Sequence, residues 1–564
     1  MSTNIAMPLF LKEKNVEKKK SQYRFGFFFP STYDVGMGGM TTSVLTQIIN
    51  QVPDWSCERF FVPWNPNLET TSMESVASLK EVDVIGFTSQ FELQYLAVVW
   101  FLQKANIPLN NLTRSQQAGK YPLIVVGGPC TMANPLPLID LVDGYFLGDA
   151  EQSLPLFLSK LTEKGVDQFW KDPLDFTEIE GFWSPYFLNN GSETQIQHPY
   201  SEYLRTNNFE DVAGIWYKKF HFVDLNDITY PLKQIIALLP DYHPYAPIKG
   251  NTFQLEIGRG CSHRCKFCMI SRLLKKGRYR DYSQLIDIAL EGTTQTGVVK
   301  VDLFGTNLSD YPRLADLCWE LINNNLKVSI ATFRPDAITN DLMEAVVKGG
   351  QTSITIAPET GSDELRRKIG KPLTNEQILQ ATEIAFAGGV ERLKNFFLVG
   401  LPSETNEDRN QILTLVHKQR NIALQFGEDN RIRADVNPVV PKWHTPMKDW
   451  VYYYLPENRA TLKKILMRLY HGLSNMAATK AKTIIFSEFV AQTWLTHLIK
   501  PVGILIKKES PQSHIPMTLN SLFYLQEFTN YFDSLLTSMW ENFKENHWKI
   551  SHLIHGTTIS DEKL

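Results

Sequence analysis

The chain has 564 residues, of which 43% are hydrophobic and 21% charged, a balance typical of a globular protein with about three to four domains. Its formal net charge of −3 gives no overall positive field, so we expect no nucleic-acid partner. No apolar run reaches the length of a membrane span, the start lacks a signal-peptide core, and the six cysteines form no disulfide framework, so we expect a cytoplasmic protein without a transmembrane segment.

Residues 1–22 are mostly polar and contain five lysines. Such a segment buries too little apolar surface to offset the entropy of ordering it. We therefore predict a disordered basic tail over these residues.

Between residues 23 and 155, short apolar runs alternate with helical patterns. The runs lie at 25–30, 82–87, 123–128 and 145–149, and helical spacing is found at 36–51 and 91–105. This alternation predicts a doubly wound, Rossmann-like parallel sheet, whose ligands bind at the carboxyl ends of the strands. The residues expected at those ends are Thr88, Ser89, Gln90, Gly127, Gly128, Pro129, Gly148 and Asp149. Taken singly, each turn is more typical of an ordinary strand-to-helix connection.

Residues 156–239 are rich in aromatic side chains and show few clean periods. We predict that they form a connector packed between domains and not a separate module.

Residues 240–449 contain six further strand patterns with helical patterns between them. The strand patterns lie at 252–257, 300–304, 327–331, 353–356, 392–398 and 434–439. Six βα units predict a partial (β/α)6 barrel of the TIM type, with its chemistry at the C-terminal ends of the strands.

The first of these strands leads to a Cys-x3-Cys-x2-Cys run made of Cys261, Cys265 and Cys268. Three soft thiolates on one loop suit three irons of a [4Fe–4S] cluster, and the fourth iron is then open to a small molecule. The alternative is a zinc site with His263 or a distant group as the fourth ligand. Zinc sites usually have two spaced ligand pairs, whereas the other three cysteines are single and far apart, so the spacing favours iron.

Residues 450–564 are predicted to form a helical domain. Near its end, apolar residues recur at helical spacing, at Leu522, Leu525, Phe528, Phe532, Leu535, Leu536, Met539 and Phe543. The plain interpretation is a helix face packed on the barrel, and the alternative is docking onto a membrane or a lipid substrate.

The cysteine run, with Phe267 directly before its last cysteine, resembles the signature of the radical S-adenosylmethionine (SAM) superfamily. The resemblance implies that the amino and carboxylate groups of SAM bind the open iron. One electron from the cluster then cleaves SAM to methionine and a 5′-deoxyadenosyl radical. The superfamily's fold is a partial barrel, which agrees with the strand pattern.

The resemblance extends to the ends of later strands. Segment 356–362 is similar to the family's SAM-binding motif, and segment 396–402 to its adenine-contacting strand, whereas the usual Gly-Gly-Glu after the second strand is missing. The implied SAM contacts are Phe267, Gly305, Thr306, Arg334, Glu359, Thr360, Ser362 and Gly400. Among them, Glu359 is expected to accept hydrogen bonds from the ribose hydroxyls.

The turns at 85–90, 126–130 and 148–151 together resemble the cobalamin-binding domain fused to many radical SAM enzymes. The cobalt-ligating string Asp-x-His-x-x-Gly is missing from the chain. Relatives often lack it, so the resemblance implies cobalamin that is held without a protein imidazole and with its own base displaced. A relic domain that has lost cobalamin is the alternative.

These resemblances imply an enzyme that transfers a methyl group to an unactivated carbon, with methylcobalamin as the donor. The alternatives are radical C–C bond formation, cyclisation or rearrangement with cobalamin structural or absent, a methylthiotransferase, and a non-enzymatic iron–sulfur or zinc sensor. A methylthiotransferase would need more cysteines in the first domain. The expected partners are an external one-electron donor, such as a ferredoxin or flavodoxin, and a substrate that is a peptide, a lipid or a small metabolite.

Overall fold

The computed structural model describes residues 11–63, 69–188, 220–241, 243, 245–274, 277–483, 486–498, 533, 534 and 537. The chain divides into two compact units, Met1–Asn251 with Leu498–Ser521, and Thr252–His497 with Leu522–Leu564. The apolar stripe expected over 522–543 lies outside the described residues. Among the helices that the structure describes, none combines the length and the apolar character that a membrane span requires.

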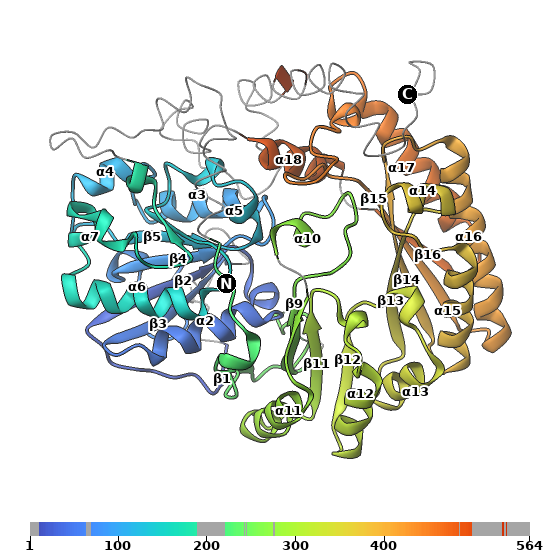
Figure 1. Cartoon of the computed structure of the whole chain (residues 1–564), viewed down its shortest axis with the longest axis horizontal. Helices are drawn as coiled ribbons and strands as arrows, with labels where there is room; N and C mark the ends of the chain where they lie inside the picture. Colours follow the sequence, from blue (N-terminus) through green and yellow to red (C-terminus); the bar gives the residue numbers. More distant parts are fainter. Residues whose placement is uncertain are drawn as a thin grey trace, which may run out of the picture. The chain divides into compact units, whose positions relative to one another are not determined.

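The first unit is built on a six-stranded sheet with the order β3-β2-β4-β5-β6-β7. Its strands are β2 (Tyr23–Phe29), β3 (Trp55–Phe61), β4 (Val84–Thr88), β5 (Leu123–Gly127), β6 (Gly144–Phe146) and β7 (Phe182–Trp183). All neighbours are parallel except β6 and β7. Helices α2 (Met40–Gln51) and α6 (Ala150–Lys164) lie on one face of the sheet, and α3 (Gln94–Lys104) and α5 (Pro129–Ala133) on the other (Figure 1). The predicted doubly wound sheet is confirmed.

Aromatic residues beyond position 155 complete the core of this unit. The ring centroid of Phe157 on α6 lies 4.7 Å from that of Phe182 on β7 and 5.5 Å from that of Phe176. The connector expected at 156–239 is therefore wrong over 156–188, where α6, α7 (Gln168–Lys171) and β7 belong to the sheet unit. The aromatic side chains that obscure the periodicity are core residues. Residues 189–219 lie outside the described part.

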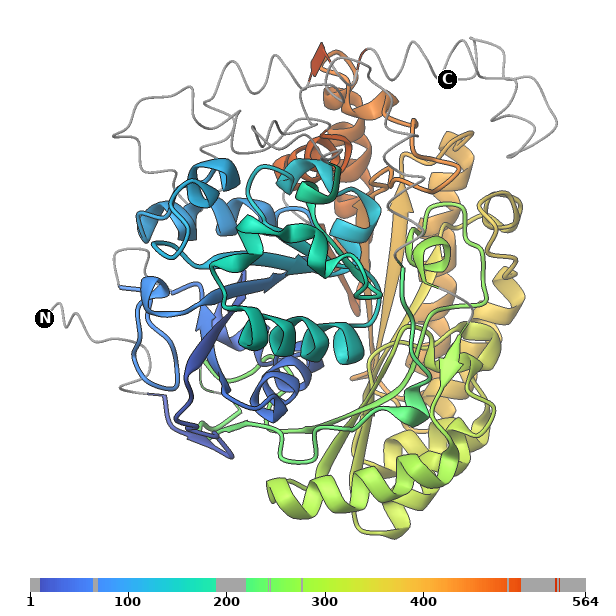
Figure 2. The same cartoon turned by 60° about the vertical axis from the view of Figure 1, so that its left-hand side comes forward.

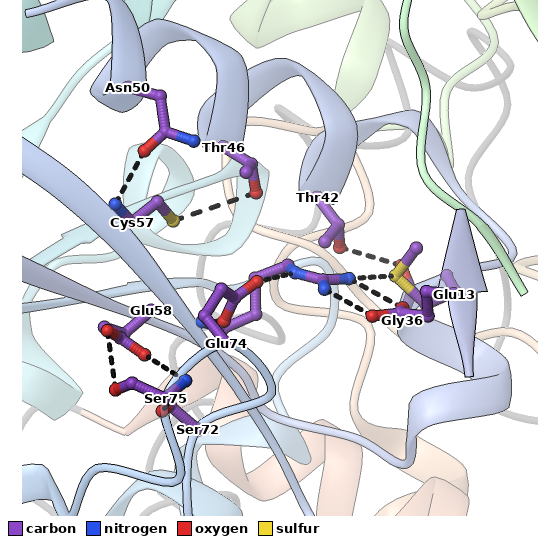
Figure 3. Close-up of polar contacts among 12 residues, drawn as sticks. Glu13, Gly36, Thr42, Thr46, Asn50, Cys57, Glu58, Ser72, Glu74 and Ser75 are labelled. Carbon is purple, nitrogen blue, oxygen red and sulfur yellow. Dashed lines mark hydrogen bonds and ion pairs between the residues drawn. The ribbon is translucent and has the colours of Figure 1, made fainter. Parts of the chain in front are cut away.

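A buried ion cluster holds the start of the described chain. Strand β1 (Glu13–Lys14) pairs antiparallel with β8 (Ile236–Ala237). The Glu13 carboxylate accepts a hydrogen bond from the fully buried Arg59 at 2.7 Å, and Glu74 accepts from another nitrogen of the same guanidinium at 2.5 Å (Figure 3). Breaking a buried pair of this kind costs about 3–5 kcal/mol. The disordered tail predicted for 1–22 is therefore wrong over residues 11–22. The ion pair of Glu13, the buried Leu11 side chain and the Lys19 hydrogen bonds to two backbone carbonyls at 2.9 Å hold this segment.

The second unit contains two four-stranded sheets, with the orders β10-β9-β11-β12 and β13-β14-β15-β16. A parallel bridge between Phe333 and Ile356 connects them. The strands are β9 (Phe253–Arg259), β10 (Arg278–Tyr279), β11 (Lys300–Gly305), β12 (Lys327–Ile330), β13 (Ser353–Glu359), β14 (Arg392–Val399), β15 (Arg431–Pro438) and β16 (Thr479–Lys482). All except β10 pair in parallel. Six of them coincide with the six predicted strands, so the predicted partial barrel is confirmed.

Helices cover the outer side of these strands (Figures 1 and 2). They are α11 (Tyr282–Thr296), α12 (Leu314–Asn323), α13 (Asn340–Lys348), α15 (Asn375–Ala387), α16 (Asn406–Phe426) and α17 (Arg459–Ser474). The buried side chains of β14 alternate with half-buried ones. Asn395 belongs to the buried set and accepts a hydrogen bond from Gln419 of α16 at 3.2 Å. The half-buried residues of β14 therefore face the inner side of the barrel.

Strand β16 was not predicted. It lies between α17 and α18 (Phe486–His497), inside the segment that was expected to be helical from residue 450. It pairs in parallel with β15. Its sequence, Thr-Lys-Ala-Lys, has too little apolar character to read as a buried strand. The helical prediction for 450–564 is thus incomplete, because an edge strand covered on one face needs no apolar run.

Candidate active site

The cysteine loop begins where β9 ends. Gly260 has a φ of +83° and its N–H donates to Thr306 Oγ1 at 3.2 Å, so the loop is tied to the end of β11. The Cys268 N–H donates to the Cys265 carbonyl at 3.2 Å, and α10 (Ile270–Leu273) follows. The structure therefore places the three thiols on one short loop at the C-terminal end of a barrel strand.

A second contact seats this loop on the turn that follows α14 (Asp363–Lys368). The Lys266 N–H donates to the Ile369 carbonyl at 2.8 Å. Gly370 has a φ of +76°, and a Cβ there would lie 3.1 Å from the Arg264 carbonyl oxygen. Both the backbone conformation and the close approach of the loop therefore favour glycine at position 370.

All three cysteines are half-buried and form no disulfide. Burial raises the pKa of the Cys265 thiol to about 11, and the charge of Lys371 opposes this rise. Burial also raises the pKa of Cys261. A metal centre bound here must displace these protons, since thiolates are the ligands of iron–sulfur clusters and of zinc.

The geometry does not support His263 as a zinc ligand. Its Nε2 lies 3.0 Å from Asp310 Oδ1. In the part of the chain that the structure describes, no group of three or more His, Cys, Asp or Glu side chains is arranged to hold a single metal ion. In a [4Fe–4S] cluster each cysteine binds its own iron, so the thiols need not converge on one point. The donor set therefore fits such a cluster better than zinc.

Two of the predicted SAM residues lie beside the loop, and a third is engaged elsewhere. Thr306 contacts Gly260 as described, and a Cβ on Gly305 would lie 3.0 Å from the Gly258 carbonyl oxygen. The Arg334 guanidinium donates to the Asp336 carboxylate at 2.7 Å. Arg334 is thus not a free cation, and its predicted contact with SAM stays a prediction.

Glu359 ends β13 in the left-handed region, with a φ of +67°. Its Oε1 accepts from Lys371 Nζ at 2.8 Å, and both side chains are about nine-tenths buried. Sequence reasoning selected Glu359 but missed Lys371. Ser362 Oγ accepts from the Leu365 N–H at 3.2 Å, so it serves as the N-cap of α14. Thr360 Oγ1 is buried and has no hydrogen-bond partner among the described residues.

Gly400 ends β14 with a φ of +78°. Its N–H donates to Glu404 Oε2 at 2.8 Å, and its carbonyl accepts from Trp450 Nε1 at 2.6 Å. Glu404 also accepts from Arg409 at 2.9 Å. Sequence reasoning missed both supporting residues, because Trp450 lies 50 residues further along the chain and Glu404 has the sequence context of an exposed loop glutamate.

In the first unit, two of the three predicted turns meet each other. The Ser89 N–H donates to the Gly127 carbonyl at 2.8 Å, and the Cys130 N–H donates to the Ser89 carbonyl at 3.3 Å. Gly128 has a φ of +113°, and a Cβ there would lie 2.5 Å from the Ser89 carbonyl oxygen. At this edge Gln90 is exposed, Gly127, Gly128 and Pro129 are half-buried, and Thr88 and Ser89 are buried.

The third turn is occupied by the chain itself. Gly148 forms a parallel bridge with His221, and a Cβ on Gly148 would lie 1.8 Å from the His221 carbonyl oxygen. Asp149 Oδ2 accepts from the Val223 N–H at 3.1 Å. Backbone from residues 221–223 therefore packs against one side of the Gly148 turn, where Gly148 stays half-buried, and its predicted contact with cobalamin stays a prediction.

Two family models match the sequence. Residues 41–185 match "Radical SAM proteins, N-terminal", and residues 255–416 match "Radical SAM superfamily". The uncharacterized protein MJ0966 of Methanocaldococcus jannaschii is 27% identical over 419 residues, which cover 74% of this chain and 77% of that protein. The ribosomal protein uS12 methylthiotransferase RimO of Clostridioides difficile is 25% identical over 230 residues, which cover 38% of this chain and only 50% of RimO.

Among solved structures, the cobalamin-dependent SAM radical enzyme OxsB with aqua-cobalamin and SAM bound has a TM-score of 0.50. It is 13% identical, and the alignment covers 96% of this chain and 82% of that chain. At this identity the likeness shows a shared fold.

Fold and site together define a protein with a doubly wound α/β unit and a partial barrel that carries a three-cysteine loop at its strand ends. The chain belongs to the radical SAM superfamily, whose cofactors are a [4Fe–4S] cluster and SAM, and it shares the fold of a cobalamin-dependent member.

Proposed function

We propose that this radical SAM enzyme uses cobalamin to transfer a methyl group to an unactivated carbon. The observation that carries the proposal is the three-cysteine loop at the end of β9, tied to the ends of β11 and α14, in a chain that also has a doubly wound N-terminal unit. The fold shared with OxsB supports the pairing of these two units with cobalamin and SAM.

Separate residues would hold the cluster and SAM. Cys261, Cys265 and Cys268 would hold the cluster, and Glu359 would orient SAM through the carboxylate oxygen that Lys371 does not use. When bound, the cluster and SAM supply the radical that activates the substrate, and cobalamin supplies the methyl group. Half-burial of the loop limits the access of water to this chemistry.

The edge formed by β4 and β5 is the part of the first unit that fits cobalamin. Gln90 is exposed there and the Gly127–Gly128 turn is half-buried, so polar backbone remains accessible to a ligand. The Gly148 turn is half-buried as well, but residues 221–223 pack against it, so we assign it a smaller part of the contact. We expect cobalamin to contact the edge at Thr88–Gln90 and Gly127–Pro129, without a histidine nitrogen on cobalt.

The cluster assignment is tested by anaerobic reconstitution. The wild-type protein should take up about four irons, and Cys265→Ala should lose SAM cleavage, because the cluster then lacks one of its three protein ligands. Cys318→Ala, which changes a buried cysteine of α12, is the matched control and should retain both. Stoichiometric zinc in place of iron, or SAM cleavage retained in Cys265→Ala, would overturn the assignment.

Cobalamin binding is tested by loading the protein anaerobically and recording electron paramagnetic resonance of the cobalt(II) form. We expect one bound cobalamin without nitrogen superhyperfine splitting, since the chain lacks the cobalt-ligating string. Nitrogen splitting would contradict the predicted absence of an axial nitrogen ligand on cobalt. A protein that cleaves SAM but retains no cobalamin would favour the radical C–C bond formation, cyclisation or rearrangement alternative.

The second candidate function is methylthio transfer, which the similarity to RimO favours. Such an enzyme needs ligands for a second cluster in its first unit. There Cys57 lies buried on β3 and Cys130 buried on α5, so only two cysteines are present and neither faces solvent. An iron content near eight per chain instead of four would support this alternative.

The substrate and the electron donor remain proposals. An external one-electron donor of the ferredoxin or flavodoxin type would supply the electron, and the substrate would be a peptide, a lipid or a small metabolite. The donor is tested by reducing the wild-type cluster with a flavodoxin system and measuring 5′-deoxyadenosine in samples quenched at set times. Failure of a reduced flavodoxin and a reduced ferredoxin, with chemical reductant active, would contradict it.

A further inference from the structure

Lys371 occupies an unusual position for a lysine. Its side chain is 9% exposed, and among the described residues its one side-chain hydrogen bond is the 2.8 Å contact with Glu359 Oε1, whose side chain is 10% exposed. An ammonium this buried is retained only when a partner compensates the loss of hydration. The pair therefore has to form together, and Lys371 fixes the carboxylate of Glu359.

The turn that carries Lys371 is fixed independently of this ion pair. The fully buried Arg366 donates to the Thr360 carbonyl at 3.0 Å and to Asp363 at 2.7 Å, and the Lys371 N–H donates to the Arg366 carbonyl at 2.9 Å. Arg366 thus ties the segment after β13 to the turn after α14. Removal of the lysine head group leaves this backbone framework in place.

The same turn touches the cysteine loop through the Lys266–Ile369 hydrogen bond. A Cβ on Gly370, the residue before Lys371, would lie 3.6 Å from Cys265 Cα, so the turn that carries the ammonium packs against this cysteine. One buried ammonium therefore lies within the electrostatic reach of two groups that are both anionic when the cluster and SAM are bound.

Glu359 keeps one oxygen for a ligand. Lys371 binds Oε1, and among the described residues no hydrogen bond to Oε2 is found. A carboxylate held at one oxygen presents the other in a fixed direction, which lowers the entropy cost of accepting a hydroxyl.

We propose that Lys371 is a positioning residue that couples the SAM site to the cluster. It holds the Glu359 carboxylate oriented toward the ribose, and it places a fixed positive charge beside the Cys265 side of the cluster. The charge favours the reduced cluster, which carries one more negative charge than the oxidised one. This inference rests on the proposed cluster and SAM site and assigns to them a residue outside the cysteine and SAM motifs.

The test compares Lys371→Met, Lys371→Arg and a matched control, Lys368→Met. Lys368 lies on α14 three residues away and pairs with Glu364, whose side chain is 65% exposed. Two quantities are measured on reconstituted protein: the reduction potential of the cluster, by titration with electron paramagnetic resonance, and the Kd for SAM.

We expect Lys371→Met to lower the equilibrium constant for reduction about tenfold, which is 59 mV for a one-electron couple. We expect its Kd for SAM to rise about tenfold as well. Lys371→Arg should restore the potential, because it keeps the charge, and Lys368→Met should change neither quantity. A wild-type potential and a wild-type Kd in Lys371→Met would overturn the proposal.

A failure of Lys371→Met to assemble the cluster is resolved by the double variant Lys371→Met/Glu359→Gln, which leaves no unpaired buried carboxylate. Its reference is the Glu359→Gln single variant, because Glu359 and Lys371 carry opposite charges. If the double variant takes up iron and has the potential of Glu359→Gln alone, the charge of Lys371 has no effect and the proposal is wrong. A potential below that of Glu359→Gln supports the proposal. If the wild-type protein itself holds no cluster, the proposed function fails and the inference fails with it. A wild-type cluster with a potential and a Kd for SAM that do not respond to Lys371→Met would overturn the inference alone.

Discussion

At the residue scale, Glu359 combines a left-handed backbone, with a φ of +67°, and near-complete burial of its carboxylate. A glutamate with positive φ costs about 1–3 kcal/mol and persists only where the surrounding structure imposes it. Arg366 on α14 and Lys371 on the turn after this helix supply that restraint. The strain and the buried charge occur together at a barrel strand end, where function is concentrated in such folds.

We predict that Glu359→Gln weakens SAM binding by about 10- to 100-fold, because a charged hydrogen bond worth about 1.5–3 kcal/mol is lost. The measurement is the Kd for SAM on reconstituted protein. Glu364→Gln is the control, since Glu364 lies on α14 and pairs with the neighbouring Lys368 at 2.6 Å. Equal losses in the two variants would show that Glu359 has no special contact.

The buried carboxyl group of Glu404 leads to a second prediction, on the pH dependence of stability. Burial raises the pKa of its carboxyl from 4.5 to about 7, against the opposing charge of Arg409. Since the folded pKa exceeds the unfolded one, the stabilisation by the bound proton is complete below pH 4.5 and is lost as the pH rises through 7.

We therefore predict that the free energy of unfolding of wild-type protein falls by about 2–3 kcal/mol more than that of Glu404→Gln between pH 5 and pH 8. Urea titrations at the two pH values measure the difference. Glu407→Gln, an exposed acid in the first turn of α16, is the control and should follow the wild type. Parallel pH dependences in wild type and Glu404→Gln would contradict the raised pKa.

At the element scale, the β13–α14 connection depends on close packing against α16. A Cβ on Gly361 would lie 2.2 Å from the Gln411 carbonyl carbon and 2.2 Å from the Ile412 nitrogen. These are backbone atoms of a helix, so they cannot move aside as a flexible side chain would. Gly361 thus lets the strand end that carries Glu359 approach α16.

Gly361→Ala should lower the free energy of unfolding by about 1–3 kcal/mol and also weaken SAM binding, because the clash displaces the neighbouring Glu359. Urea denaturation and the Kd for SAM report the two effects. Gly39→Ala is the control, since a Cβ at that position would meet no atom within 4 Å. An unchanged unfolding midpoint in Gly361→Ala would refute the packing argument.

At the scale of the whole molecule, each unit carries its own candidate site on its own sheets. A change confined to one unit should therefore leave the cofactor of the other in place. Gly128→Ala is suited to this test, because a Cβ there would lie 2.5 Å from the Ser89 carbonyl oxygen and distort the β4–β5 edge.

We predict that Gly128→Ala retains about four irons and SAM cleavage but loses most bound cobalamin after anaerobic loading. Iron analysis, 5′-deoxyadenosine formation and the absorbance of retained cobalamin are the measurements. Gly119→Ala is the control: its φ of +81° makes the backbone strain comparable, but the nearest atom to a Cβ there is 4.0 Å away. Loss of cobalamin from both variants would mean that strain alone is responsible.

The sequence by itself determined the fold class, the six barrel strands and the three candidate cluster ligands. These features depend on local information: strands of an α/β protein are short apolar runs, and the ligands of the loop lie within eight residues. It also selected Glu359, since the segment around it resembles a family motif. The polar strand β16 and the aromatic segment 156–188 were not predicted. Their hydrophobic patterns depend on which faces the rest of the fold buries, and the sequence does not show this.

Tertiary structure alone decided which side chains support the site. Lys371 reaches Glu359 across 12 residues of sequence, Trp450 reaches Gly400 across 50, and Arg59 reaches Glu13 across 46. It also decided that backbone from residues 221–223 packs against the Gly148 turn. Such contacts join residues that share no sequence periodicity, so they cannot be predicted from a local pattern. They are specified in the folded chain, because burial makes each unpaired polar group costly.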